Sequence, residues 1–284
     1  MDVTDSRVAV APGVHLHVRR WPGDRPPAFL LVHGLSSNAR LWDEVAGRIA
    51  GAGHAAYAVD LRSHGESDQP ADGYDTATAA ADLAALAETL GLEKVIVAGQ
   101  SWGGNVAVSL AAEHPRLVAG LALVDGGWID LSADFASWEE CAAALRPPDL
   151  DGTRVSHVRG WLRRAHPDWS AAAVEATVAN LRVAPDGTLT RRLPIPRHMQ
   201  IVRSMWDDPP RRHLPAVAVP TLLLPAIPRD DPRRAERARS RVAAAAAVLS
   251  TATIREYADS DHDLHAQHPD RVAADLLSLV EGSS

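Results

Sequence analysis

The stretch that decides the fold is Lys94-Val-Ile-Val-Ala-Gly-Gln-Ser-Trp-Gly-Gly104. Its apolar first half has the length of a buried strand, and the residues that follow, 105–114, have the composition of a helix. A serine between a strand and a helix in a G-x-S-x-G pattern is typical of a nucleophile elbow. Gly99 and Gly103 fit this turn because side chains at these positions would collide. The pattern therefore predicts that the Ser101 hydroxyl stands exposed above the sheet, at the positive end of a helix dipole.

Predicted strands and helices alternate along the rest of the chain. Apolar runs bounded by turn residues predict strands at residues 8–10, 15–20, 27–32, 55–59, 94–98, 117–124, 218–224 and 253–258. The predicted helices cover residues 38–50, 75–90, 105–114, 232–249 and 269–280. The first two strands flank Pro12-Gly13 and predict an antiparallel hairpin. The alternation predicts an α/β fold with a mostly parallel eight-stranded sheet and helices on both faces.

One block of the sequence breaks this alternation. From Trp128 to about His213 there is no clear strand pattern, but helical stretches occur at residues 135–145, 155–165, 170–183 and 199–206. The block holds five of the eight tryptophans, namely Trp128, Trp138, Trp161, Trp169 and Trp206. For any one of these tryptophans, we expect that the side chain packs the block onto the rest of the protein. Five together suggest a bulky apolar or aromatic substrate.

The composition excludes several classes of protein. The chain has 284 residues, of which 46% are hydrophobic, as expected for one large globular domain or a domain with an insertion. Its net charge is −7, and the most basic stretch, 229–241, is interrupted by Asp230, Asp231 and Glu236, so we expect no nucleic-acid partner. No apolar run approaches the roughly 18 residues of a membrane-spanning helix, so we expect no membrane partner. Cys141 is the only cysteine and the N-terminus lacks a signal-peptide pattern, which favours a cytoplasmic protein.

Polar residues follow most of the predicted parallel strands, at the edge where ligands bind in such sheets. Ser101 needs a base within hydrogen-bond reach, and His262, four residues after the last strand, is the best placed histidine. His265 and His268 are nearby and are expected to cap or cover the last helix. The alternative is that the three histidines bind a metal with a neighbouring aspartate. Because no ligand motif such as H-E-x-x-H appears, we predict no metal.

The acid that orients the histidine has two candidates. Asp125 ends the strand after the one that leads to Ser101, and two glycines after it leave room. Asp230 follows the next strand in a loop where nearby arginines would lower its pKa or pair with it in solvent. We favour Asp125 and keep Asp230 as the alternative. Asp60, which also ends a strand, is expected to anchor a loop.

An acyl-transfer site also needs N–H donors for the oxyanion that develops on the substrate. We expect the N–H of Trp102, directly after the serine, and the N–H of Leu35, in the loop after an earlier strand, to supply them. His33 is expected to shape that loop by hydrogen bonds. Trp128 and His33 are the residues that we expect to contact the substrate.

These motifs together resemble the α/β-hydrolase family over nearly the whole chain. His33-Gly34-Leu35 resembles the oxyanion turn of the family, and Asp60-Leu-Arg-Ser-His-Gly-Glu-Ser-Asp68 resembles its D-x-R-G-H-G-x-S segment. The stretch 99–103 resembles its elbow. His262, seven residues before Pro269, matches the family's terminal histidine and the helix after it.

The chain departs from the family pattern at three places. Ser63 stands where the family has a glycine, and Asp261 stands where it has a glycine before the histidine. Residues 226–229 replace the family's G-x-x-D after the seventh strand, which is the main reason for placing the acid at Asp125. A carboxylate at Asp261 would raise the pKa of His262 or point to solvent.

The resemblance implies an α/β-hydrolase core at residues 1–127 and 214–284, with a helical cap at residues 128–213. A serine in the nucleophile position implies a serine-type hydrolase that needs no cofactor. We predict that it cleaves a carboxylic ester or lactone bond of a bulky apolar or aromatic small molecule through an acyl-serine intermediate. The alternatives are a carbon–carbon bond hydrolase or cofactor-free oxygenase on the same fold, and a non-catalytic protein that binds a small molecule.

Overall fold

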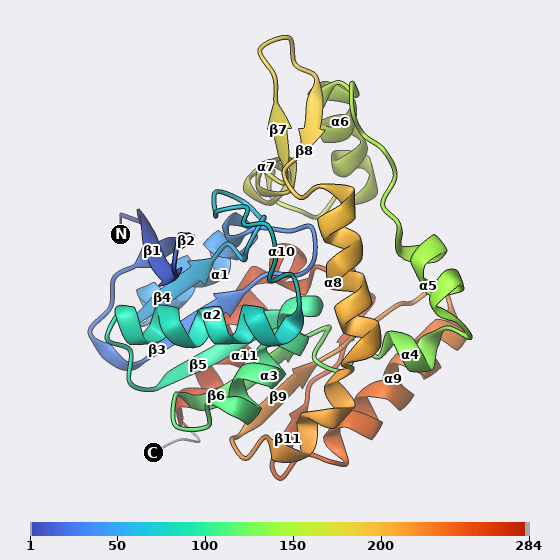
Figure 1. Cartoon of the computed structure of the whole chain (residues 1–284). Coiled ribbons are helices and arrows are strands. Elements are labelled where there is room, and N and C mark those ends of the chain that lie inside the picture. The colour runs from blue at the N-terminus through green and yellow to red at the C-terminus, as the bar shows by residue number, and fades with distance from the viewer. Residues whose placement is uncertain (1, 282–284) are drawn as a thin grey trace.

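A mostly parallel sheet forms the centre of the protein, whose computed structural model describes residues 2–281 (Figure 1). Within these residues eight strands lie in the order β1 (Thr4–Ala11), β2 (Val14–Trp21), β4 (His54–Val59), β3 (Arg25–Val32), β5 (Val95–Gln100), β6 (Val118–Val124), β9 (Thr221–Leu224) and β11 (Ala252–Ile254). β2 is antiparallel to both β1 and β4, and the other neighbours are parallel. The predicted sheet and its N-terminal hairpin are confirmed.

Helices cover both faces of this sheet (Figure 1). The covering helices are α1 (Asp43–Gly51), α2 (Thr76–Thr89), α3 (Trp102–Glu113) and α11 (Pro269–Glu281). Alternate residues of β3 separate two cores: Leu30 and Val32 pack with α2 and α3, whereas Phe29 and Leu31 pack with α1 and α11. The predicted α/β architecture is therefore confirmed. None of the helices in the described range has both the length and the apolar character to span a membrane.

Polar side chains start several of the predicted helices. Asn38 Oδ1 accepts a hydrogen bond from the N–H of Arg40 in the 3₁₀ helix η1 (Ala39–Trp42), which leads into α1. The Asp75 carboxylate accepts from the N–H of Thr78 at the start of α2. Asp231 caps α9 (Pro232–Ala246) in the same way. These acceptors satisfy N–H groups that have no partner within the first turn of a helix.

Residues 128–213, which we call the inserted segment, lie between β6 and β9. Its helices are α4 (Leu131–Asp134), α5 (Trp138–Leu145), α6 (Val155–Ala165), α7 (Ala171–Val178), α8 (Ile195–Asp207) and the 3₁₀ helix η2 (Pro210–Arg212), and η3 (Leu214–Ala216) follows it. Hydrogen bonds fasten the segment to two loops of the sheet. Asn38 Nδ2 donates to the Ala176 carbonyl over 2.7 Å, and the Thr76 N–H donates to Ser204 Oγ over 2.9 Å.

The prediction that this segment contains no strand is wrong. β7 (Leu181–Val183) and β8 (Leu189–Arg191) pair antiparallel and stand away from the sheet near α6 and α7 (Figure 1). The helix predicted over 170–183 therefore ends at Val178. The signal for this hairpin is the turn Pro185-Asp186-Gly187, where the Asp186 carboxylate accepts from the Thr188 N–H over 3.0 Å and Gly187 has φ of +81°.

The strand predicted over 253–258 is divided in the structure. β11 joins the main sheet, whereas β12 (Tyr257–Ala258) pairs in parallel with β10 (Ala226–Ile227). After β12 the chain forms the short helix α10 (Leu264–Gln267) and then α11. The β10–β12 pair brings the loop that carries His262 next to the loop that follows β9.

Candidate active site

Ser101 lies at the sharp turn between β5 and α3. Its backbone has φ of +53° and ψ of −125°, a conformation that costs a non-glycine residue about 1–3 kcal/mol. A Cβ on Gly99 would lie 2.2 Å from the Gly103 carbonyl oxygen, and a Cβ on Gly126 would lie 2.2 Å from the Ser101 carbonyl oxygen. Glycines on both sides therefore let the turn close, and Ser101 is left partly exposed.

Asp125 follows β6 and meets His262 in the loop between β12 and α10. His262 Nδ1–H donates to Asp125 Oδ2 over 2.6 Å, and the Ala226 N–H donates to Asp125 Oδ1 over 3.0 Å. Because a carboxylate only accepts, this bond assigns the proton to Nδ1 and leaves Nε2 free to act as a base. Asp230 is exposed and makes no hydrogen bond to His262 among residues 2–281. The structure thus brings together Asp125 and His262 and leaves Asp230 aside.

The charges near His262 set its acid–base behaviour. Partial removal of the ring from water lowers the pKa of His262, but the hydrogen bond and charge of Asp125, with the charge of Asp263, outweigh this and raise the pKa above 6.5. Asp261 stands where the family has a glycine, and its carboxylate is expected to raise the pKa of His262 or to point to solvent. In the structure this carboxylate accepts a hydrogen bond from His166 Nδ1 over 2.7 Å. This bond ties the loop of His262 to the inserted segment.

Gln100 also contributes to the site, although its position in the G-x-S-x-G motif tolerates any residue. The side chain is buried, and Nε2 donates to the His262 carbonyl oxygen over 3.1 Å. Its Oε1 lies so near the loop after β3 that a Cβ on Gly34 would come within 2.4 Å of it. Gln100 therefore connects the strand before Ser101 to two other loops of the site. In the sequence, the only signal for this role is that the variable position before Ser101 holds an amide side chain.

The loop after β3 lies directly against Ser101. A Cβ on Gly34 would lie 2.9 Å from Ser101 Cβ. The N–H groups of Leu35 and Trp102 have no hydrogen-bond partner in the described part of the chain, and neither has the Ser101 hydroxyl. Ser101 and His262 therefore make no hydrogen bond to each other. Such catalytic bonds often form only when substrate is bound.

His33 holds this loop in place. Its side chain is fully buried, Nδ1–H donates to the Gly34 carbonyl over 2.7 Å, and Nε2 accepts from the Leu61 N–H over 3.0 Å. Burial lowers the pKa of His33, which keeps the ring neutral. The expected hydrogen bonds are present. The expected contact with substrate stays a prediction, and the full burial of His33 does not favour it.

Asp60 anchors the loop after β4, as expected. Its carboxylate accepts from the N–H of Ala39 over 2.7 Å and of Glu66 over 3.0 Å, and it hydrogen-bonds His17 over 2.7 Å. Burial would raise the pKa of Asp60, but these hydrogen bonds outweigh it and lower the pKa to about 2. In the same loop Ser63 has φ of +63°, a left-handed backbone conformation that glycine adopts easily. This explains why the family has a glycine here, and Ser63 occupies the position with some backbone strain.

A pocket of about 510 Å³ opens beside Asp125 and His262. Trp128, which we expect to contact substrate, lines it together with Ile129 and Leu145. These side chains give the pocket an apolar wall next to the histidine.

The other tryptophans of the inserted segment serve packing or face solvent. Trp138 and Trp206 meet edge to face with ring centroids 6.1 Å apart and pack on the main core. Trp169 is buried and stacks on His166, and Trp161 is exposed. The expectation that each tryptophan packs the segment onto the rest of the protein therefore holds for Trp138, Trp169 and Trp206, and also for Trp128, which packs on the main core as well as lining the pocket.

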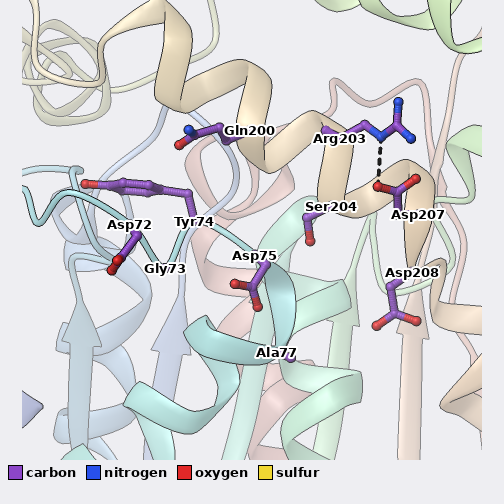
Figure 2. A pocket seen from close by; sticks show the side chains of 10 residues that line it. All are labelled: Asp72, Gly73, Tyr74, Asp75, Ala77, Gln200, Arg203, Ser204, Asp207 and Asp208. Atoms are coloured by element: carbon purple, nitrogen blue, oxygen red, sulfur yellow. Dashed lines mark hydrogen bonds and ion pairs between the residues drawn. The ribbon is translucent and has the colours of Figure 1, made fainter.

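A second pocket, of about 420 Å³, lies between the start of α2 and α8 (Figure 2). Its lining is acidic, with Asp72, Asp75, Asp207 and Asp208 around it. Arg203 Nε donates to the Asp207 carboxylate over 2.8 Å. No predicted catalytic residue lines this pocket, whereas Asp125 and His262 line the first one, although Ser101 is not among the residues that line it.

The two histidines after His262 make packing and hydrogen-bond contacts within the protein. His265 is fully buried and its ring lies against Trp42 at a tilt of 40°, with ring centroids 4.4 Å apart. His268 is hydrogen-bonded to Ser260 Oγ over 2.9 Å. Over residues 2–281, no group of histidine, cysteine and carboxylate side chains is arranged to hold a metal ion.

Comparisons with known proteins agree with this architecture. Residues 27–180 match a family described as alpha/beta hydrolase fold. Lipase LipV of Mycobacterium tuberculosis is 38% identical over 112 residues, which are 39% of this chain and 42% of that protein. 2-(Acetamidomethylene)succinate hydrolase of Mesorhizobium japonicum is 35% identical over 99 residues, 35% of each protein. The chain therefore matches less than half of the length of these curated relatives.

A solved structure extends the likeness to the whole chain. The crystal structure of E-2-(acetamidomethylene)succinate hydrolase matches with a TM-score of 0.80 and covers 99% of this chain and 100% of that one. The sequence identity over this match is 21%, so it bears on the fold alone.

Proposed function

This chain belongs to the alpha/beta hydrolase fold family, and from that premise we propose that it is a serine-type hydrolase of carboxylic esters or lactones. The observation that carries the proposal is the 2.6 Å hydrogen bond between Asp125 and His262 at the sheet edge where the Ser101 turn stands. A relative named as a lipase adds support for ester substrates. The proposed reaction uses only side-chain and backbone groups of the chain.

In this reaction Ser101 Oγ attacks the substrate carbonyl carbon while His262 Nε2 takes the hydroxyl proton. Asp125 stabilises the resulting imidazolium through the bond to Nδ1–H. His262 then gives the proton to the leaving alkoxide, and the acyl group remains on Ser101 as an ester. His262 next takes a proton from a water molecule, whose oxygen attacks the acyl carbon. The bond from the acyl carbon to Ser101 Oγ then breaks, His262 returns the proton to Oγ, and the acid leaves. A lactone gives a single hydroxy acid by the same steps.

We assign the oxyanion hole to the N–H groups of Leu35 and Trp102. Each such donor contributes roughly 3 kcal/mol to stabilising the tetrahedral intermediate in acyl transfer. The close approach of Gly34 to Ser101 supports this assignment. The indole of Trp102 donates to Thr76 Oγ1 over 3.1 Å, which holds the residue whose N–H is required.

We further propose that residues 128–213 act as a cap over Ser101. Two bonds to catalytic loops support this role: His166 to Asp261, and Ser36 Oγ to His198 Nδ1 over 2.9 Å. A cap excludes water from the reaction and shapes the substrate pocket. The apolar wall at Trp128 suits a bulky apolar or aromatic group.

The test is hydrolysis of 4-nitrophenyl acetate and butyrate by the wild-type protein and by Ser101→Ala. The variant is expected to lose about 10⁴-fold or more in kcat with an unchanged melting temperature, because it removes only the nucleophile. Full hydrolysis by Ser101→Ala contradicts the proposal.

Product analysis separates the alternatives. An ester hydrolase releases an acid and an alcohol, or one hydroxy acid from a lactone. A carbon–carbon bond hydrolase and an oxygenase on this fold give other products. A protein that only binds a small molecule turns over none of these substrates.

A further inference from the structure

The pocket that holds His262 has a cationic wall that the proposed chemistry does not use. Arg234, Arg237 and Arg241 lie on α9 and all three line this pocket of about 510 Å³. Their spacing of three and four residues puts them on one face of the helix. The arginine-rich stretch of the sequence thus borders the same cavity as the Asp125–His262 pair.

The arginines carry more positive charge than the nearby carboxylates neutralise. Arg241 forms an ion pair with Asp134 of α4, which also lies near enough to Arg237 for their charges to interact. Within residues 2–281, the side chains of Arg234 and Arg237 make no ion pair or hydrogen bond. Asp125, which lines the pocket, is engaged by His262. Three guanidinium groups therefore face two carboxylates that already have partners.

Arginines on an exposed helix ordinarily point into solvent, so the outward side of α9 is a useful comparison. Arg239 pairs with Glu256, and Arg233 is exposed and does not line the pocket. Among the described residues, Arg234 and Arg237 are exposed and unpaired like Arg233, and what distinguishes them is that they line the pocket beside Asp125 and His262. A guanidinium binds a carboxylate in a two-point geometry that no neutral ester group matches.

We propose that the substrate of this pocket ends in a carboxylate, which Arg234 and Arg237 bind while an apolar spacer lies along Trp128. The surplus of one positive charge fits a monoanion better than a dianionic phosphate. This inference rests on the proposed function, because it names the substrate class of the same site.

The experiment compares 4-nitrophenyl half-esters of succinate, adipate and suberate with the matching methyl diesters, which have the same chain and leaving group without the charge. For the best chain length, the wild-type kcat/KM is expected to be about 10- to 100-fold higher for the half-ester, the range of a charge-assisted hydrogen bond. The double variant Arg234→Gln/Arg237→Gln is expected to bring this ratio close to one. Arg233→Gln removes the same charge from the same helix and is expected to keep the ratio.

Each outcome decides one claim. Equal kcat/KM for half-esters and diesters in the wild-type protein, or a high ratio that persists in the double variant, overturns the carboxylate site and leaves the proposed hydrolase intact. Hydrolysis of neither series overturns the hydrolase. In that case calorimetric titration with free adipate decides the site: binding that the double variant loses supports it, and no binding overturns it. Thermal unfolding of each variant checks that it is folded.

Discussion

The turn that carries Ser101 and the loop that carries His262 meet at one edge of the sheet, yet different forces hold them. At Ser101, backbone packs against backbone, and a Cβ on Gly99 or Gly126 would come within 2.2 Å of a carbonyl oxygen. The loop of His262 is held by side chains from elsewhere, including Asp125 and Gln100. The His262 side chain is also 52% exposed.

This difference has a chemical consequence. In the proposed mechanism the nucleophile must stand in one place, and close backbone packing at the glycines of the turn holds it there. The base must move a proton between serine, leaving group and water, and its loop is held by hydrogen bonds that single substitutions can remove. We therefore expect substitutions in the two regions to have different effects. Those in the turn are expected to lower the free energy of unfolding, and those in the loop are expected to lower kcat.

The largest expected effect is on the loop side, at Asp125. Asp125→Asn is expected to lower kcat by about 10⁴-fold, because an amide can fix the wrong tautomer of His262 and cannot stabilise its cation. Asp230→Asn, the matched control, is expected to change kcat by less than about twofold, since Asp230 lies outside the site. Steady-state kinetics on a 4-nitrophenyl ester measures both. A larger loss in Asp230→Asn contradicts the assignment of the acid.

On the turn side, Gly99→Ala is expected to reduce the free energy of unfolding by about 3 kcal/mol or more, because its Cβ collides with the Gly103 carbonyl. Gly47→Ala is the control. Gly47 lies in α1, and a Cβ added there would have no other atom within 4 Å, so alanine is expected to stabilise the protein by about 0.5–1 kcal/mol. Urea unfolding measures both values, and equal stability of the two variants contradicts the steric account of the turn.

Gln100 tests the connection between the two regions. Gln100→Leu keeps the size of the side chain but removes the donor to the His262 carbonyl, so the loop loses one fixed point. We expect kcat to fall about tenfold with little change in KM, since Gln100 positions His262 and does not line the pocket beside it. An unchanged kcat would show that the loop is held without this bond.

The smallest effect concerns the pH dependence of the reaction. His262 must be neutral to accept a proton, and its pKa is raised above 6.5, so kcat/KM is expected to fall about tenfold per pH unit below a midpoint above 6.5. The charge of Asp263 contributes to this rise, so Asp263→Asn is expected to move the midpoint to lower pH by less than about one unit. A pH profile of kcat/KM for both proteins is the measurement, and a midpoint that stays or rises in the variant contradicts the electrostatic account.

The same contrast explains what can be predicted from the sequence. Most of the turn at Ser101 depends on residues that are neighbours in the chain, so Gly99, Gly103, the strand and the helix are readable in one short motif, whereas the need for Gly126 is not. The sheet and its helices follow from apolar periodicity. Asp125 is preferred over Asp230 partly because the residues after β9 lack the family's aspartate.

Contacts between segments that are distant in the chain cannot be predicted from local sequence patterns. The bond from Gln100 to His262 joins residues far apart in sequence, and no local pattern specifies it. The burial of His33 and the arginine wall of α9 likewise depend on tertiary packing. The β7–β8 hairpin is an exception, since the turn at Pro185-Asp186-Gly187 is a local signal that helical composition nearby obscures.

The measurement that tests the central claim most directly is covalent labelling with a fluorophosphonate, followed by peptide mapping. We expect one adduct per chain, located on Ser101, with a labelling rate that falls by several orders of magnitude in His262→Ala, because the histidine activates the serine. Thermal unfolding of the variant serves as the folding control. A label on another residue, or equal labelling of Ser101 in the folded His262→Ala protein, would contradict the assignment of Ser101 and His262 as nucleophile and base.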